Sequence, residues 1–368
     1  MRIGVPVETA AGERRVALVP DSVARLVKAG HQVRVQRGAG AGSFHPDTAY
    51  SSAGASLVDG STVFDDVDLL AKVRPPSDDE ASKLKAGTSI VALLQPAVNA
   101  ELFSKFTASK VTAFAMELVP RITRAQSMDA LSSQATIAGY KAVLIGAAEL
   151  PKLLPMLTTA AGTLAPSKVF VIGAGVAGLQ AIATARRLGA SVSGFDIRAA
   201  AGEQVKSLGA AFLSSEVVSQ AAEDKGGYAK AQAEDERQRT LETIHKHIVS
   251  QDMVITTAQI PNRPAPKLIT DEMVAAMKPG SVIVDIAADT GGNTTLTKPG
   301  ETVRMNGVAI LAPLNLAATE PVHASQMFSK NIETFINHIS KDGALMVDLA
   351  DEITKAMTIT HNGELLRK

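Results

Sequence analysis

The chain has 368 residues, of which 46% are hydrophobic, and its 37 Lys and Arg residues balance its 37 Asp and Glu residues. That length favours two domains, the apolar content argues against disorder, and the balanced charge gives no reason to expect nucleic acid or an anionic membrane surface as a partner. The absence of cysteine excludes disulfides, thiolate nucleophiles and Cys-ligated zinc.

The first third of the chain alternates short apolar runs with helical patterns. Residues 2–7 read as a strand. Residues 20–30 read as a helix, with Asp21 placed to cap it, Val23, Leu26 and Val27 on one face, and Gly30 to end it. Further strands are expected at 32–36, 68–73, 89–94 and 111–116. This alternation is typical of a parallel, doubly wound sheet.

The segment 121–134, RITRAQSMDALSSQ, does not look like an ordinary turn. Nine of its fourteen side chains are polar, and it holds no Gly or Pro. Arg121 and Gln126 offer several donors to a pyrophosphate or a carboxamide, and Asp129 could hold the arginine in place. A solvated loop with a helix cap at Asp129 or Ser132 explains the same residues. A longer helix is expected over 132–150.

A second alternating series follows, with strands expected at 168–172, 191–196, 252–257, 281–286 and 308–312. Residues 222–240 are charged and contain glycine, which indicates a long surface loop running into an exposed helix; loops of that length are often lids. An amphipathic helix is expected over 320–341. No stretch reaches about 18 uninterrupted apolar residues, so we expect no membrane-spanning segment. The N-terminal apolar run is short and soon meets Glu8, so we expect no signal peptide.

Residues 168–198 carry the most specific motif. Gly173, Gly175 and Gly178 form G-x-G-x-x-G between a β-branched strand and a helix, and a second strand ends at Asp196. In this context the glycines permit a tight turn, backbone approach to a pyrophosphate, and close packing of helix on strand. The helix N-terminus would face the phosphates. The alternative is a Rossmann-like fold without a ligand.

The end of that second strand bears on which cofactor is bound. Asp196 should accept hydrogen bonds from the adenosine ribose, which favours NAD(H), whereas Arg198 could hold a 2′-phosphate. We expect NAD(H), because a carboxylate repels that phosphate. The seven histidines are scattered, and His245 and His247, two residues apart, point to different faces of a helix. No metal site is expected.

These motifs together resemble a known family. The chain is similar to the soluble NAD(H)-binding α subunit (domain I) of proton-translocating NAD(P) transhydrogenase and, more distantly, to alanine dehydrogenase. The resemblance covers nearly the whole length. It rests on four segments: GVPVETAAGERRVALVP at 4–20, RITRAQSMDALSSQ at 121–134, GAGVAG at 173–178 and VDIAADTGGN at 284–293.

The resemblance implies a fold and a set of site residues. The fold would be α/β, with two Rossmann-like doubly wound parallel-sheet domains and a cleft between them. Residues 1–136 plus 318–368 would form the first domain, and 137–317 the NAD-binding domain. The residues beside the nicotinamide would be Arg121, Gln126, Asp129 and Ser132. The nucleotide-binding residues would be Gly173, Ala174, Gly175, Val176, Gly178, Asp196, Ile197, Arg198, Tyr228, Ala258 and Gln259.

The implied activity is hydride transfer from NADH to NADP+ held on a partner β subunit, with membrane-embedded subunits coupling the step to proton movement. NADP(H) would bind only on the partner. The chain would be a homodimer, cytoplasmic and held peripherally at the inner or plasma membrane by its partners. Tyr228 matches a mobile-loop tyrosine, with Gly226 and Gly227 as hinges. An exposed tyrosine without a role is the alternative.

The departures from alanine dehydrogenase are informative. Arg74 and Gln95 stand where that enzyme carries a Lys and a His, although Arg15 and Asp289 are retained. Reducing an imine needs a proton donor near neutral pKa, whereas hydride exchange between two nicotinamides needs only alignment and exclusion of water. Two other hypotheses stay open: a free-standing amino-acid dehydrogenase like alanine dehydrogenase, and a nucleotide-sensing module without catalysis.

Overall fold

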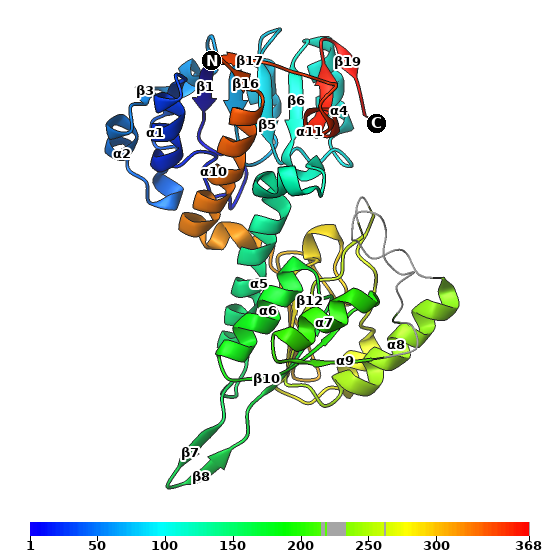
Figure 1. Ribbon diagram of the computed structural model, residues 1–368. Helices are drawn as coiled ribbons and strands as arrows, with labels where there is room; N and C mark the ends of the chain where they lie inside the picture. Colours follow the sequence, from blue (N-terminus) through cyan, green and yellow to red (C-terminus); the bar gives the residue numbers. More distant parts are fainter. Residues whose placement is uncertain (215–217, 219–232, 261–262, 368) are drawn as a thin grey trace. The chain divides into compact units, whose positions relative to one another are not determined.

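A computed structural model describes residues 1–214, 218, 233–260 and 263–367 (Figure 1). The chain divides into two compact units, each described separately below. Unit 1 comprises Met1–Gln134 with Ala317–Lys368, and unit 2 comprises Ala135–Leu316. These boundaries lie within two residues of the domain limits expected from the sequence. The cleft expected between the domains stays a prediction.

Unit 1 is built on an eight-stranded sheet with the order β19-β18-β6-β5-β4-β1-β2-β3. Its strands are β1 (Arg2–Val5), β2 (Gln32–Gln36), β3 (Ser56–Val58), β4 (Leu69–Ala71), β5 (Ser89–Ala92), β6 (Thr112–Ala115), β18 (Thr358–His361) and β19 (Glu364–Leu365). Strands β1 to β6 pair in parallel with one another, whereas β18 runs antiparallel to both β6 and β19. The parallel sheet expected from the sequence therefore ends in two antiparallel strands from the C-terminal tail.

Helix α1 (Pro20–Lys28) shows how local chemistry sets an element's limits. Pro20 occupies the first helical turn, where its fixed φ suits the helix and its missing N–H costs nothing. The helix therefore begins before Asp21, which lies in the first turn and does not cap it, so that expectation was wrong. Val23 and Leu26 are buried, and Gly30 follows the helix with a φ of 91°.

The tail returns to unit 1 through helix α10 (Pro321–His338). Its apolar face, including Phe328 and Phe335, joins the core that contains Ile3 and Val5. Phe335 meets Phe114 edge to face, with ring centroids 5.2 Å apart. The remaining helices of unit 1 are α2 (Asp47–Ser52), α3 (Asp78–Ser82), α4 (Ala100–Ala108) and α11 (Glu352–Met357), with 3-10 helices η1 (Ala41–Ser43), η2 (Gly60–Phe64), η3 (Met116–Leu118), η4 (Thr123–Met128) and η7 (Leu316–Thr319).

Unit 2 holds a seven-stranded sheet with the order β11-β10-β9-β12-β13-β15-β14. Its strands are β9 (Lys168–Ile172), β10 (Ser191–Phe195), β11 (Ala211–Phe212), β12 (Met253–Thr256), β13 (Val282–Asp285), β14 (Thr302–Met305) and β15 (Val308–Leu311). Only β14, at one border, is antiparallel to its neighbour within this sheet.

Helices cover both faces of the unit 2 sheet. Ala142, Ile182 and Val205 share one core cluster, and Ile244 and Val274 belong to another. The first cluster draws on α5 (Ala130–Glu149), α6 (Val176–Arg187) and α7 (Ala199–Ser207), the second on α8 (Glu234–Ile248) and α9 (Asp271–Ala276); η6 (Ala288–Thr290) follows β13. A two-layered core on a mostly parallel sheet is the doubly wound arrangement the sequence predicts.

A hairpin that the sequence did not reveal projects from unit 2. Strands β7 (Leu157–Thr159) and β8 (Gly162–Leu164) pair only with each other, and all six residues are exposed (Figure 1). Unit 1 carries a second small ribbon, β16 (Ser340–Lys341) with β17 (Ala344–Leu345). Within the described ranges, no helix combines the length and the apolar character needed to cross a membrane.

Candidate functional site

The glycine loop joins β9 to α6 in unit 2. Gly173 has a φ of 95°, and a Cβ there would lie 2.6 Å from Thr257 Oγ1. A Cβ on Gly178 would lie 1.8 Å from the carbonyl oxygen of Gly173, so this helix turn packs too closely for any side chain. The fold itself therefore requires glycine at both positions.

Gly175 differs from the other two glycines. It precedes α6 in an extended conformation, and a Cβ there would meet no atom of the protein within 4 Å. The chain alone does not require glycine at this position, but a ligand approaching the backbone would. The first turn of α6 adds unpaired N–H groups and a positive dipole end. These features fit a nucleotide pyrophosphate.

Asp196 follows β10 and is almost fully buried. Its carboxylate accepts hydrogen bonds from the Ala174 N–H at 2.8 Å and from the Arg198 N–H at 2.9 Å. The Arg198 guanidinium also grips both oxygens, with Nε at 2.9 Å and Nη2 at 2.7 Å. Asp196 thus ties the glycine loop to its own strand end. Arg198, considered as a possible phosphate ligand, is paired with the carboxylate.

Of the other residues expected at the nucleotide, Ala174 is buried, Ile197 is half-buried and Val176 is exposed at the start of α6. Ala258 and Gln259 lie two and three residues after the end of β12, the strand next to β9 in the sheet order. Tyr228, Gly226 and Gly227 lie outside the described residues. The structure therefore brings the glycine loop, Asp196, Arg198 and Ala258 together in unit 2.

The polar segment 121–134 belongs to unit 1 and contains η4. Ala125 and Met128 point into the core, while Arg121 and Gln126 are exposed. Asp129 accepts hydrogen bonds from the Ser132 N–H at 2.9 Å and from Ser132 Oγ at 2.6 Å, so it caps α5. The capping role considered for Asp129 is thus present. Its carboxylate holds Ser132, and Arg121 remains on the exposed side of the segment.

The back of this segment is tied to the C-terminal part of unit 1. Asn331 on α10 donates through Nδ2 to the Ser127 carbonyl at 2.8 Å. Arg124 pairs with Asp351, the cap of α11, at 2.7 Å. Burial works against ionisation of Asp351, but hydrogen bonds from the Thr354 N–H, Arg124 and His338 hold its pKa well below the usual range. The segment is therefore positioned by the returning tail.

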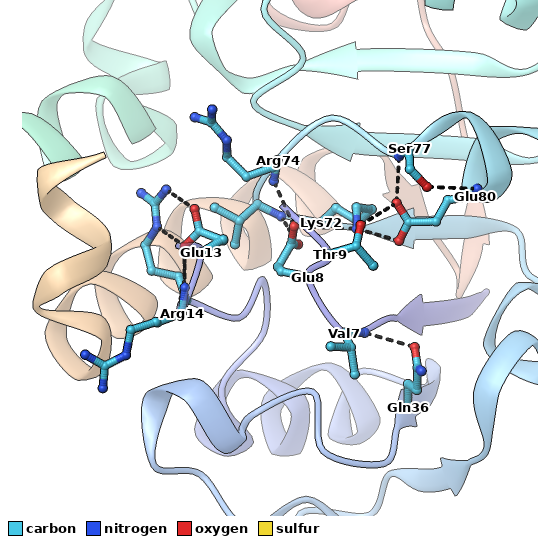
Figure 2. A network of polar contacts seen from close by, with 12 residues as sticks. Val7, Glu8, Thr9, Glu13, Arg14, Gln36, Lys72, Arg74, Ser77 and Glu80 are labelled. Carbon is cyan, nitrogen blue, oxygen red and sulfur yellow. Dashed lines mark hydrogen bonds and ion pairs between the residues drawn. The ribbon is translucent and has the colours of Figure 1, made fainter. Parts of the chain in front are cut away.

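A cluster of buried charges lies where β1 and β4 end in unit 1 (Figure 2). Lys72 is 0% exposed; its Nζ lies 2.8 Å from Glu80 Oε1 and 3.5 Å from Glu8 Oε2. Glu8 accepts from the Val73 and Arg74 N–H groups at 2.6 and 3.2 Å. Burial raises the pKa of Glu8, although Lys72 and these donors oppose the shift.

A second buried ion pair joins Arg15 to Glu13, which is labelled in Figure 2. The Nε and Nη2 of Arg15 contact the two oxygens of Glu13 at 2.8 and 2.6 Å, and its Nη1 donates to Gln134 Oε1 at 2.7 Å. Both side chains are almost fully inaccessible. The guanidinium of Arg15, which is retained from alanine dehydrogenase, therefore already binds a carboxylate of the protein.

Arg74 and Gln95 border this region. Gln95 has a φ of 52°, and its N–H donates to Glu117, which also accepts from the Leu94 N–H at 3.1 Å. Burial raises the pKa of Glu117, although those N–H groups oppose the shift. Asp289 is exposed and receives the Asn315 N–H at 3.4 Å. Across the described residues, no three His, Asp or Glu side chains group as metal ligands would.

Sequence reasoning missed the Glu8–Lys72–Glu80 cluster and the hydrogen bond from the Asn293 N–H to Asp285. Their residues lie 8 to 72 positions apart along the chain and meet only when the strands pair. The one local signal was a charged residue directly after an apolar strand, as in Lys72 after β4 and Asp285 at the end of β13. Such residues gather at the carboxyl ends of parallel strands, where α/β proteins bind ligands.

The fold and the loop define a two-unit α/β protein with a dinucleotide-type glycine loop. Family models agree with that class: the alanine dehydrogenase/PNT N-terminal domain matches residues 4–138, and the C-terminal domain of the same family matches residues 142–368. The chain belongs to the alanine dehydrogenase/PNT family.

Individual relatives show which members of the family this chain is most similar to among those compared below. The chain is 44% identical to an NAD(P) transhydrogenase subunit alpha chain of Rhodospirillum rubrum, covering 100% of this chain and 98% of the relative. A crystal structure of transhydrogenase from Sinorhizobium meliloti superposes with a TM-score of 0.91 at 44% identity, over 99% of this chain and 100% of that one. Alanine dehydrogenase of Mycobacterium tuberculosis is 30% identical, over 100% of this chain and 95% of the relative.

Proposed function

We propose that this chain is the NAD(H)-binding component of a proton-translocating NAD(P) transhydrogenase. It would pass a hydride from NADH to NADP+ bound on a partner β subunit. Membrane-embedded subunits would couple that step to proton movement and hold the chain at the inner or plasma membrane from the cytoplasmic side. The observation that carries the proposal is the open backbone at Gly175 beside Asp196, in a chain 44% identical to a transhydrogenase α subunit.

The residues of this chain would act by binding and aligning. The glycine loop and the first turn of α6 would hold the pyrophosphate, and Asp196 the adenosine ribose. The nicotinamide, when bound, supplies the hydride. Arg121 and Gln126 lie exposed and would orient the carboxamide side of the ring, while Asp129 and Ser132 fix the segment that carries them. No group needs to exchange a proton at the reacting carbons.

A titration of the isolated chain with each cofactor tests the nucleotide assignment. We expect NADH to bind and NADPH to bind at least about tenfold more weakly. The Asp196 carboxylate repels a 2′-phosphate, and the Arg198 guanidinium is paired with that carboxylate. Reconstitution with the partner subunits then tests hydride transfer. Equal affinity for the two cofactors would contradict the proposal.

The runner-up is a free-standing alanine dehydrogenase, favoured by the full-length similarity to that enzyme. The unit 1 geometry argues against it. Arg15 is paired with Glu13, and Arg74 and Gln95 stand where that enzyme carries its Lys and His. General acid–base catalysis contributes about 10² to 10⁴ in rate, so we expect no turnover of alanine with NAD+ or of pyruvate, ammonia and NADH. Turnover near the common enzyme value of about 10 per second would promote the runner-up.

The homodimer expected from the family resemblance is also a proposal. The β7–β8 hairpin supports it, because Met156, Leu157 and Leu164 are exposed and an isolated two-stranded hairpin is only marginally stable in water. Residues 153–167 contain no ionisable side chain, so two copies could meet there without repulsion. Light scattering should give twice the chain mass, and a monomer at micromolar concentration would refute this element of the proposal.

A further inference from the structure

Asn293, the last residue of the VDIAADTGGN motif, is 0% exposed and uses its whole side-chain amide. Its Oδ1 accepts the Ala258 N–H at 3.0 Å. Its Nδ2 donates to the Ala258 carbonyl and to the Pro266 carbonyl, both at 2.8 Å. One side chain therefore binds both polar backbone groups of Ala258, as a neighbouring strand would.

Asp285 fixes the loop that presents Asn293. This carboxylate is also 0% exposed and accepts the Asn293 N–H at 2.7 Å and the Thr294 N–H at 3.1 Å. Thr256 Oγ1, from the paired strand end, donates to it at 2.9 Å. Gly292 lets the loop fold over the carboxylate, because a Cβ there would lie 2.5 Å from Asp285 Oδ2. The backbone at Asn293 is thus fixed by its hydrogen bond to Asp285.

The contact continues from Ala258 to the glycine loop. The preceding residue, Thr257, donates through Oγ1 to the Gly173 carbonyl at 2.9 Å. Gly173 begins the tight turn of that loop, and its missing Cβ makes room for the Thr257 hydroxyl. Asn293 therefore sets where residues 257–259 lie against the glycine loop.

The strand order of the sheet indicates which half of a bound dinucleotide would lie near residues 257–259. The strand sequence reverses between β9 and β12, so Asp196 beside β10 and Ala258 after β12 lie on opposite sides of the reversal. In doubly wound nucleotide sites the adenosine half binds on one side of this point and the nicotinamide half on the other. Residues 257–259 therefore belong to the nicotinamide side.

We propose that Asn293 is a positioning residue for the nicotinamide half of NAD(H), acting through Ala258 and Thr257. It does not touch the nucleotide. Because Asn293 occupies the Ala258 N–H and one of the two lone pairs of the Ala258 carbonyl, a ligand reaches this strand end through the remaining lone pair or through side chains such as Gln259. This inference rests on the proposed NAD(H) site and adds a role for the motif at 284–293.

The test compares NADH with ADP, which lacks the nicotinamide half. Asn293→Ala should raise the Kd for NADH about tenfold, which corresponds to about 1.4 kcal/mol, the order of one lost hydrogen bond, and change the Kd for ADP less than about twofold. Val308→Ala is the matched control. Val308 is fully buried in the same sheet, at the amino end of β15, away from the strand ends that carry the site. It should lower the melting temperature and leave both Kd values unchanged.

Each outcome bears on the inference. If Asn293→Ala weakens NADH and ADP equally, or weakens neither, Asn293 is only structural and the inference is overturned. If the wild-type chain binds neither ligand, the proposed function fails before any variant is compared.

Should Asn293→Ala not fold, Thr257→Val keeps the shape and removes only the bond to Gly173. Weaker NADH with unchanged ADP supports the inference, and two unchanged Kd values contradict it.

Discussion

The two units carry the same doubly wound order and use its reversal point differently. In unit 1 the order reverses between β1 and β4, and in unit 2 between β9 and β12. At the first point the strand ends are filled by Glu8, Lys72 and Glu80, which satisfy one another. At the second the strand ends carry Gly173 and Gly175 and the open first turn of α6. The architecture alone therefore does not make a nucleotide site; the residues at the strand ends do.

The strand ends of the two units also differ in what they cost in free energy. Charges withdrawn from water need partners, so the unit 1 cluster is costly to break and has no cation to spare for a ligand anion. Backbone N–H groups at a helix N-terminus keep their capacity to bind an anion without a buried charge. We expect substitutions at the unit 1 strand ends to act on stability, and those at the unit 2 strand ends to act on binding.

The largest effect should come from Lys72→Met. Removing the one ammonium leaves Glu8 and Glu80 buried without a cation, which costs about 3–5 kcal/mol of unfolding free energy. Lys83→Met is the control, since its pair with Asp79 is largely exposed and is worth at most about 1 kcal/mol. Urea unfolding measures both. A similar small loss for the two variants would show that the unit 1 cluster contributes little.

Arg121→Ala and Gln126→Ala should follow, acting on rate. Both side chains are exposed on unit 1, whereas the glycine loop that would anchor the nucleotide belongs to unit 2. Misplacing the reacting ring by about 1 Å can cost on the order of 100-fold in hydride transfer, while NADH affinity changes little. Single-turnover assays with the reconstituted partners separate the two quantities. Normal transfer at saturating NADH would remove these residues from the site.

Gly175→Ala sharpens the unit 2 side of the comparison. The protein has space for the added methyl group, so the melting temperature should stay near that of the wild type. A nucleotide lying against that backbone would be overpacked by about 1–3 kcal/mol, or roughly 5- to 150-fold in Kd. Gly178→Ala, where the methyl group would strike the Gly173 carbonyl, should instead lose stability and binding together. Unchanged NADH affinity in Gly175→Ala would place the nucleotide elsewhere.

The smallest effect concerns Glu8 and pH. Burial raises the pKa of Glu8, so the folded state binds a proton more readily than the unfolded state. Stability from this group is therefore present at low pH and is lost as pH rises from the usual glutamate range through the raised pKa. Glu8→Gln should remove that loss and unfold at a higher temperature than wild type at pH 7.

That difference should shrink toward zero near pH 4, where Glu8 in the wild-type chain is protonated. Thermal unfolding across pH 4 to 8 makes the comparison. A Glu8→Gln variant that is less stable than wild type at pH 7 would mean that the attraction of Lys72 outweighs the burial of the second carboxylate.

Local signals carried much of this structure. The glycine loop, Asp196 and the strands of both series follow from spacing within about 30 residues, and the structure confirms the doubly wound class. Asp21 was misassigned because Pro20 starts the helix earlier. The strands of the β7–β8 hairpin are fully exposed and give only a weak sequence pattern. Strand β18 joins its sheet only because the C-terminal tail returns to unit 1. The ion pairs of Glu8 and Arg15 depend on tertiary contacts that no window of sequence contains.

Hydrogen–deuterium exchange of the isolated chain, with and without saturating NADH, tests the central contrast most directly. Slower exchange with NADH is expected in peptides covering residues 172–180, because their backbone N–H groups would face the pyrophosphate. Peptides covering Leu69–Ala71 in β4 should exchange equally slowly in both states, since they are buried regardless of ligand. Protection confined to the strand ends of unit 1, with none at the glycine loop, would contradict the account.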